Sequence, residues 1–139
     1  DINYIVTLKG IASKSNINVK GALQDKAKKS FKGTLDFKQG ASKSVGAEDE
    51  YCMLLSKDAK AKAMPVLLCS EDDVSGEHSA SSGKIDESKL FYLMSRGLTY
   101  EDAKIVIVRA AFNPIIDAID DENTINEILE KLNRGLKNE

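Results

Sequence analysis

The chain contains few of the residues on which extracellular, sugar-binding and membrane proteins depend. Its 139 residues include no tryptophan, two cysteines, two prolines and one histidine. Two cysteines do not make a disulfide framework in a chain of this size, which favours a reducing, cytoplasmic setting. No apolar run reaches the roughly 20 residues of a membrane-spanning helix. The net charge of −2 gives no overall attraction to nucleic acid or to an anionic membrane.

Several catalytic motifs are missing as well. The run Ser82-Gly83-Lys84-Ile85 holds the Gly-Lys pair of a phosphate-binding loop, but it lacks the upstream glycine and the Ser or Thr that would hold magnesium. There is no Cys-x-x-Cys pair, no His-Glu-x-x-His helix and no nucleophile elbow. We therefore expect no ATP site on this chain.

A change of composition near Gly83 predicts two parts, residues 1–83 and 84–139. The first part holds seven of the nine glycines, and it carries 12 lysines without arginine against 11 acids. Interspersed lysines and acids predict a solvated face rather than a nucleic-acid groove. The chain opens at Asp1 with no initiator Met and no signal segment, so we expect it to start within a longer protein.

Short alternating runs predict strands in the first part. Ile2, Tyr4, Val6 and Leu8 share one face at the period of a strand. Lys-Gly pairs recur at 9–10, 20–21 and 32–33, which is typical of stacked β-coils or of a small β-sandwich. The pattern supports a β structure and leaves that choice open. Further runs lie at 17–19, 31–37, 51–55 and 66–69.

Capping residues and apolar periodicity predict helices in the second part. Asp86 is expected to cap a helix over 87–96 that ends at Gly97. Thr99 is expected to open a second helix, which Pro114 ends or kinks. The β-branched run Ile105–Val108 suits a strand equally well, but the spacing of its neighbours favours a helix. Those neighbours are Ala103, Val106, Ile107, Ala110 and Ala111.

A third helix is predicted near the end of the chain. Thr124 and Glu127 have the spacing of a cap, and an apolar stripe follows at helical intervals. Such a stripe packs on its own domain more often than on another protein. Its members are Ile125, Ile128, Leu129, Leu132 and Leu136.

The segment 69–79 concentrates metal-ligating residue types. It holds Cys69, four carboxylates and His78, and thiolate, imidazole and carboxylate are all ligands that iron accepts. The alternative is a plain turn, in which the acids bind their own backbone, His78 lies at the surface and Cys69 is a small buried apolar residue. Spacing alone gives only a weak metal signal.

From this segment onward the sequence closely resembles the C-terminal signature of the SufB/SufD family. The resemblance rests on 71–74, on the histidine-containing loop expected at 77–86, and on the Leu-Phe-Tyr-Leu block at 90–98. Upstream, 31–35 and 53–56 also match, and the likeness runs from about Ala27 to Ala118.

The resemblance implies a right-handed parallel β-helix, a single-stranded β-solenoid, followed by a C-terminal helical segment. It implies a non-catalytic scaffold subunit of the SUF iron–sulfur cluster assembly complex. Such a subunit pairs with a SufB/SufD sister subunit or with its own copy, and its C-terminal helices hold the SufC ATPase. The cluster would be transient and shared with the partner subunit. ATP would belong to SufC, which agrees with the missing phosphate loop.

The resemblance also suggests which residues carry function. His78 coincides with the histidine that SufD-type members place at the assembly interface. Glu50 stands where SufB-type members have a scaffold cysteine, and Cys52 shares its strand face if the period of two holds. Glu77 is a further candidate ligand, and Ser79 replaces the glutamate of SufB, which favours a SufD-like member. For docking the ATPase the candidates are Leu90, Phe91, Tyr92, Arg96 and Leu98.

Two other functions remain open from the residues. Many β-helix proteins cleave acidic polysaccharides, and Asp72, Asp73, Glu77 and His78 are candidates for that chemistry. The absence of tryptophan, which sugar-binding platforms use, argues against it. The other possibility is a purely structural interaction module, in which His78 is an ordinary loop residue.

Overall fold

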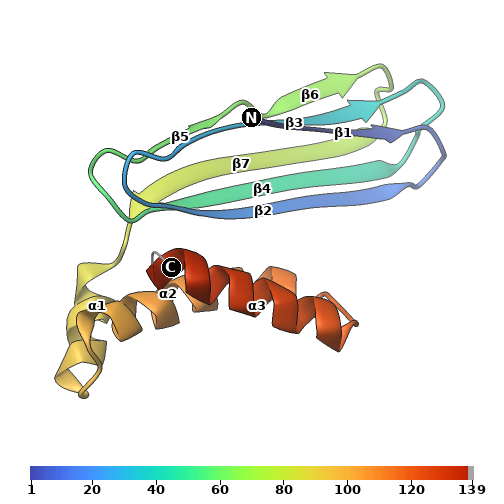
Figure 1. The fold of residues 1–139 in the computed structure, drawn as a ribbon. Helices are drawn as coiled ribbons and strands as arrows, with labels where there is room; N and C mark the ends of the chain where they lie inside the picture. Colours follow the sequence, from blue (N-terminus) through green and yellow to red (C-terminus); the bar gives the residue numbers. More distant parts are fainter. Residues whose placement is uncertain (138–139) are drawn as a thin grey trace. The chain divides into compact units, whose positions relative to one another are not determined.

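The computed structural model describes residues 1–137 and divides the chain into two compact units, Asp1–Gly83 and the part that begins at Lys84. The first unit is made of strands and the second of helices (Figure 1). The strands are β1 (Ile2–Leu8), β2 (Lys14–Leu23), β3 (Lys28–Phe37), β4 (Ser44–Leu54), β5 (Lys60–Ala63), β6 (Val66–Cys69) and β7 (Val74–Lys84); the helices are α1 (Glu87–Ser95), α2 (Tyr100–Ile116) and α3 (Glu122–Lys137).

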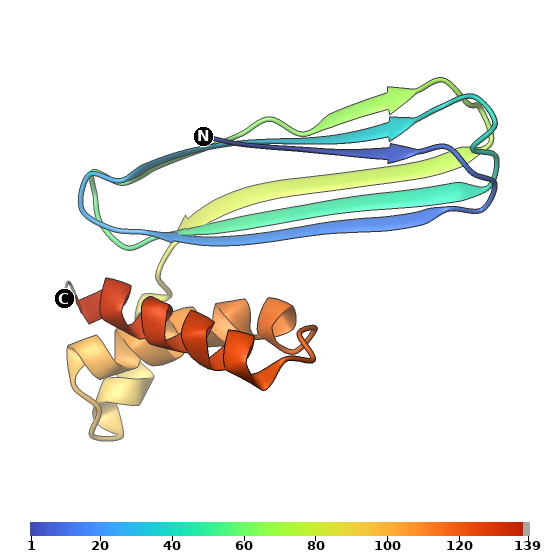
Figure 2. The ribbon, with the colours of Figure 1, turned by 45° about the vertical axis from the view of Figure 1, so that its right-hand side comes forward.

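The strands of the first unit form two sheets that lie one above the other (Figures 1 and 2), and the chain alternates between them except at β5 and β6, which follow each other in one sheet. One sheet, sheet A, contains β1, β3, β5 and β6, and the other, sheet B, has the order β2-β4-β7. The registered pairs are parallel, with Ile2 opposite Phe31 and Lys28 opposite Lys60. The chain therefore returns to the same sheet, one strand further on, about every 30 residues. The fold is mixed β and α, with parallel sheets and a C-terminal helical segment.

The Lys-Gly pairs do not mark the repeat that the sequence suggested. Gly10 lies on the turn after β1, whereas Gly21 and Gly33 lie within β2 and β3. Their spacing of 11 and 12 residues is much shorter than the offset between paired strands. The predicted strands are present, but the spacing of the Lys-Gly pairs does not correspond to the repeat of the fold.

The core of the first unit lies between the two sheets. Phe31, Leu35 and Phe37 of β3 are fully buried, together with Leu8 and Ile17 of the neighbouring strands. Gly46 of β4 makes room for this layer, since a Cβ at Gly46 would lie 2.8 Å from the Phe37 ring. Burial of these side chains is the main favourable term for the unit.

Two strands were only partly predicted or missed. β4 begins at Ser44, whereas the sequence predicted a strand only from Tyr51. Its first half was missed because it is acidic, contains a glycine and lacks an apolar alternation. β7 was expected to be a loop, yet it is an 11-residue strand of sheet B. Its sequence is polar, so its strand structure comes from pairing with β4 rather than from burial of its own side chains.

The helical unit begins as predicted. The Asp86 carboxylate accepts hydrogen bonds from the backbone N–H groups of Ser88 and Lys89 and caps α1. Gly97 ends the turn after α1 with φ +99°, a conformation that glycine adopts without strain. The N–H groups of Gly97 and Leu98 bond back to Met94 and Leu93, which completes a Schellman motif.

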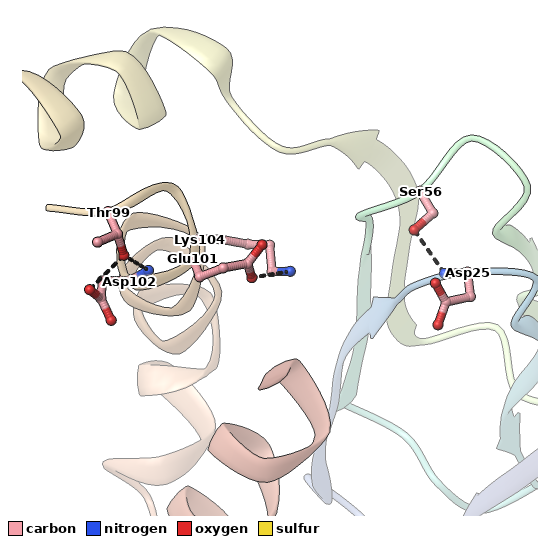
Figure 3. A network of polar contacts seen from close by, with 6 residues as sticks. All are labelled: Asp25, Ser56, Thr99, Glu101, Asp102 and Lys104. Carbon is pink, nitrogen blue, oxygen red and sulfur yellow. Dashed lines mark hydrogen bonds and ion pairs between the residues drawn. The ribbon is translucent and has the colours of Figure 1, made fainter. Parts of the chain in front are cut away.

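α2 is helical through the β-branched run, as its spacing favoured. Thr99 caps it by accepting a hydrogen bond from the Asp102 N–H (Figure 3). The buried face differs from the predicted one, because Ile105 and Val108 are buried whereas Val106 is exposed. Pro114 lies in the last turn, and the helix ends two residues later.

The third helix starts earlier than predicted. Asp121, rather than Thr124, supplies the capping carboxylate, which accepts hydrogen bonds from the N–H and the hydroxyl of Thr124. These bonds lower the pKa of Asp121. Among the described residues, no helix is both long enough and apolar enough to cross a membrane.

Candidate functional site

The inward face of β4 carries an acidic row. Side chains alternate along this strand, and Glu48, Glu50 and Cys52 all point into the space between the sheets. Glu48 is 3% exposed, Glu50 is 1% exposed and Cys52 is fully buried. Cys52 thus shares the face of Glu50, as the period of two predicted. Buried carboxylates need specific partners, because burial without compensation costs several kcal/mol.

Glu50 has such a partner in Lys29 of β3. The ammonium of Lys29 donates to Oε1 of Glu50, and both side chains are almost completely buried. The Lys29 ammonium also lies 5.2 Å from the centre of the Phe31 ring. The charge on Glu50 is therefore balanced inside the protein, and a cation ligand at Glu50 would compete with Lys29.

Glu48 lies in the same row without a complete set of partners. Its Oε2 is buried and has no hydrogen-bond partner in the described part of the chain. The carboxylate lies against the backbone of Gly33, where a Cβ would be 2.2 Å from Oε1. Burial raises the pKa of Glu48, the His78 charge acts in the opposite direction, and the Glu50 charge adds to the rise.

Cys52 completes the row as a buried thiol. Burial raises its pKa, the charge of Lys29 lowers it and the charge of Glu50 raises it. The thiolate is the form that binds metals, so the net rise disfavours metal binding while the site stays closed. A Cβ at Gly21 would lie 3.1 Å from the sulfur, which shows how closely β2 covers this thiol.

β7 presents His78 and Glu77 on opposite faces. A Cβ at Gly76 would touch Phe37 and Leu67, so Gly76 faces the interior, and His78 two residues on shares that face. His78 is nevertheless exposed, because β7 is the edge strand of its sheet. His78 therefore lies on the same face of sheet B as the acidic row. Glu77 faces outward and is exposed.

A small cavity opens beside the buried pair. Its volume is about 90 Å³, and Glu50 is its one charged lining residue. Small side chains of β5 and β7 make the rest of the wall: Ala61, Ala63, Ala80, Ser81 and Ser82. The cavity is large enough for a few water molecules or a small ion and too small for a cofactor.

The remaining candidates are dispersed. Asp73 lies on the turn before β7, where it accepts a hydrogen bond from the Ser42 hydroxyl. It is roughly 16 Å from His78 along the direction of the strand. Cys69 is exposed rather than buried as expected. Within residues 1–137, no three His, Cys, Asp or Glu side chains gather closely enough to hold a metal. The polysaccharide-cleaving set is not brought together at one point.

Comparison with known proteins shows the family of the chain. Residues 1–111 match the family model described as SUF system FeS cluster assembly, SufBD core domain. The chain belongs to the SufBD family. It is 33% identical over 128 residues to the iron–sulfur cluster assembly protein SufD of Bacillus subtilis, which covers 92% of this chain and 29% of the relative.

Other relatives within the SufBD family give the same picture. SufD of Escherichia coli is 32% identical over 117 residues, which is 84% of this chain and 28% of the relative. A SufBD family protein of Pyrococcus horikoshii is 39% identical over 79 residues, 57% of this chain and 18% of the relative. The chain thus spans less than a third of the length of these relatives. The family assignment and its SufD-like character are confirmed.

The SufBD helical unit also holds the residues proposed for docking. Phe91 is 74% exposed and Tyr92 is 56% exposed, and the Arg96 guanidinium lies 5.4 Å from the centre of the Tyr92 ring. Leu98 is half-buried, and Leu90 is buried in the helical unit. Phe91, Tyr92 and Arg96 are therefore available to a partner, whereas Leu90 is not.

Sequence reasoning missed the interior lysine and one of the two glutamates. Lys29 and Glu48 were assigned to a solvated face, yet both lie between the sheets. The signal was the spacing of Glu48, Glu50 and Cys52, which places two acids and a thiol on one strand face. Recognising it required knowing that this face points inward.

Proposed function

We propose that this chain is part of a non-catalytic scaffold subunit of the SUF machinery. In this proposal it pairs with a SufB/SufD sister subunit or with its own copy, and it docks a SufC-type ATPase in the cytoplasm. The observation that carries the proposal is β7, an 11-residue edge strand that bears His78 on the same face of sheet B as the buried acidic row.

The two parallel sheets support a right-handed parallel β-helix for this region. β1 pairs in parallel with β3, β2 with β4, and β3 with β5 and β6, and the register advances by about 30 residues at each return. Stacked coils of this kind bury one continuous apolar interior and leave a free edge at the last coil. β7 lies at such an edge.

The free edge of β7 suits association with a second subunit. An exposed strand offers unpaired N–H and C=O groups that a strand from another chain can bind. His78 would then lie at the seam between the two subunits. This assembly would bring the imidazole near groups of the partner. It is compatible with membership of the SufBD family.

The cluster would be cargo that the two subunits hold together. Clusters commonly take four thiolate or imidazole ligands. This chain offers one exposed imidazole, a buried thiol at Cys52, an exposed thiol at Cys69 and a carboxylate at Glu50 that Lys29 already holds. We propose that His78 is the first contact, that Glu50, Cys52 and Glu77 assist, and that the partner supplies the remaining ligands.

The ATPase would bind the exposed part of α1. Phe91 and Tyr92 place two large aromatic side chains in solvent, and large exposed apolar side chains that lie together mark interaction sites. Arg96 over the Tyr92 ring adds a cation to the same surface. A partner with a complementary groove would bury both rings.

Anaerobic reconstitution tests the assembly site. The full-length protein, purified with its sister subunit and ATPase, is supplied with iron and sulfide, and acid-labile sulfide and visible absorbance are measured. We expect His78→Ala to lose most of the cluster and Ser75→Ala, an exposed change on the same strand, to keep it. An unchanged yield in His78→Ala would favour the plain interaction module.

Co-purification tests the docking surface. We expect Phe91→Asp combined with Tyr92→Asp to abolish retention of the ATPase while the sister subunit stays bound. Asn126→Asp, which adds a charge on the exposed face of α3, is the control. Normal retention of the ATPase by the double variant would reject α1 as its docking site.

A further inference from the structure

Four lysines form a patch on the outer face of sheet A, which we call the lysine patch: Lys28 and Lys32 of β3, and Lys60 and Lys62 of β5. Their orientation follows from their neighbours. Lys29 and Phe31 point into the interior, so Lys28 and Lys32 point outward. Ala61 lines the interior cavity, so Lys60 and Lys62 also point outward. All four side chains are exposed.

The register places these charges side by side. Lys28 is directly opposite Lys60, so their Cα atoms are about 4.8 Å apart, and Lys62 follows about 7 Å along β5. The turns that precede the two strands are stacked, since the Ser56 hydroxyl accepts a 2.8 Å hydrogen bond from the Asp25 N–H (Figure 3). This contact holds the two strand starts in register.

The positive charge of the lysine patch is not balanced by ion pairs among the described residues. Other lysines of this unit make ion pairs, namely Lys20 with Asp49, Lys29 with Glu50 and Lys38 with Asp36. None of the four patch lysines makes an ion pair within residues 1–137. Like charges directly opposite each other in a sheet are destabilising. The arrangement therefore costs stability, which an anionic partner would restore.

The composition of the face indicates which anion fits. Residues 1–83 contain no arginine, so bidentate recognition of phosphate is absent from this unit. Phe31 of β3 is buried, and Tyr4 of β1, although 55% exposed, lies on the inward face of sheet A, so bases would find no aromatic ring beside the lysine patch. Exposed lysines without aromatics suit transient, salt-dependent contact with carboxylates.

The charge distribution also limits the size of the partner. Glu71, Asp72 and Asp73 lie beyond the opposite ends of the strands, about 30 Å from Lys28. A long polyanion that followed the strands would meet these acids. A compact acidic surface would cover the lysines without reaching these three acids.

We propose that the lysine patch docks an acidic surface of another protein, transiently and in a salt-dependent manner. The proposal is independent of the assembly function, because the patch lies on sheet A and faces away from the interior row that His78 borders. It adds a third protein contact to those proposed at β7 and α1.

The test uses the full-length protein and an immobilised deca-glutamate peptide at low and high salt. A ten-nucleotide single-stranded DNA and phosphatidylglycerol vesicles are the comparison probes. Lys28, Lys32, Lys60 and Lys62 are changed together to Gln. The control changes four other exposed lysines to Gln: Lys9, Lys14, Lys43 and Lys84.

We expect the patch variant to bind the glutamate peptide about tenfold more weakly at low salt, as four exposed charge pairs would give, with the control unchanged. High salt should remove the difference. Equal losses in the two variants would overturn the proposal, since net charge would then explain the binding. Stronger patch-dependent retention of the DNA or the vesicles than of the peptide would also overturn it, in favour of that other partner class. Circular dichroism confirms that both variants are folded.

Discussion

The ammonium of Lys29 on β3 is paired with the carboxylate of Glu50 on β4 in the space between the two sheets. The pair joins sheet A to sheet B at the point where the interior opens into the small cavity. It also holds the carboxylate of Glu50, which we propose as an assisting cluster ligand. Both the stability of the first unit and the availability of Glu50 to a metal depend on this contact.

Removing one member of the pair should be costly. Lys29→Met leaves Glu50 buried and charged without a partner, and we expect a loss of about 3 kcal/mol in the free energy of unfolding. The double variant Lys29→Met with Glu50→Leu should recover most of it, because no unpaired charge remains. Urea unfolding measures both. Lys20→Met, whose partner Asp49 is half-exposed, should cost about 1 kcal/mol or less. Equal effects at Lys29 and Lys20 would contradict the interior pair.

Glu48 should make stability depend on pH. Burial raises its pKa above the ordinary value of 4.5. The folded state therefore binds this proton more tightly than the unfolded state, and the resulting stabilisation is complete below 4.5 and is lost as the pH rises through the folded pKa. We expect Glu48→Gln to be more stable than the parent at neutral pH, by about 1 kcal/mol, with the gap closing in acid. Thermal unfolding of the parent and of Glu48→Gln across pH measures this.

Gly33 should tolerate no side chain while Glu48 is present. A Cβ at Gly33 would overlap the Glu48 carboxylate, so Gly33→Ala should destabilise the protein by about 2 kcal/mol. Adding Glu48→Ala should relieve the overlap, and the two changes should be strongly non-additive. Gly135→Ala in α3, where a Cβ meets nothing within 4 Å, should stabilise by about 0.5 kcal/mol. Additive effects of the first two changes would place Glu48 elsewhere.

Replacing Ser79 with glutamate should destabilise the protein. The Ser79 hydroxyl donates a 2.5 Å hydrogen bond to Asp49, and this bond and the Lys20 ammonium lower the pKa of Asp49. Ser79→Glu would set two carboxylates side by side, and we expect a loss of about 1 kcal/mol that high salt reduces. Ser79→Ala, which removes only the hydrogen bond, should be insensitive to salt. A salt-independent loss in Ser79→Glu would argue against charge repulsion.

Local signals were predicted well because their causes are local. The alternation of β1, the Asp86 and Thr99 caps and the Gly97 terminus each depend on residues within one or two turns of the chain. The start of the third helix was predicted too late, because Asp121 and Thr124 are both suitable capping residues and only the hydrogen bonds distinguish them.

The long-range features were predicted poorly. β7 was expected to be a loop, since nothing in its polar sequence shows that β4 lies beside it. Lys29 and Glu48 were expected in solvent, since a period of two defines two strand faces without showing which one is inside. The docking residues were predicted from the family resemblance, which did not separate Leu90, which is buried, from Phe91, which is exposed.

The sequence alone determined the family, the change from strands to helices near Gly83, and the helix caps, because each is written in neighbouring residues. Only the tertiary structure decided that Lys29 reaches Glu50, that Glu48 lies against Gly33 and that His78 stands on an edge strand. These contacts join residues 15 or more positions apart. They arise when the chain returns to the same sheet about every 30 residues, and no local pattern encodes that return.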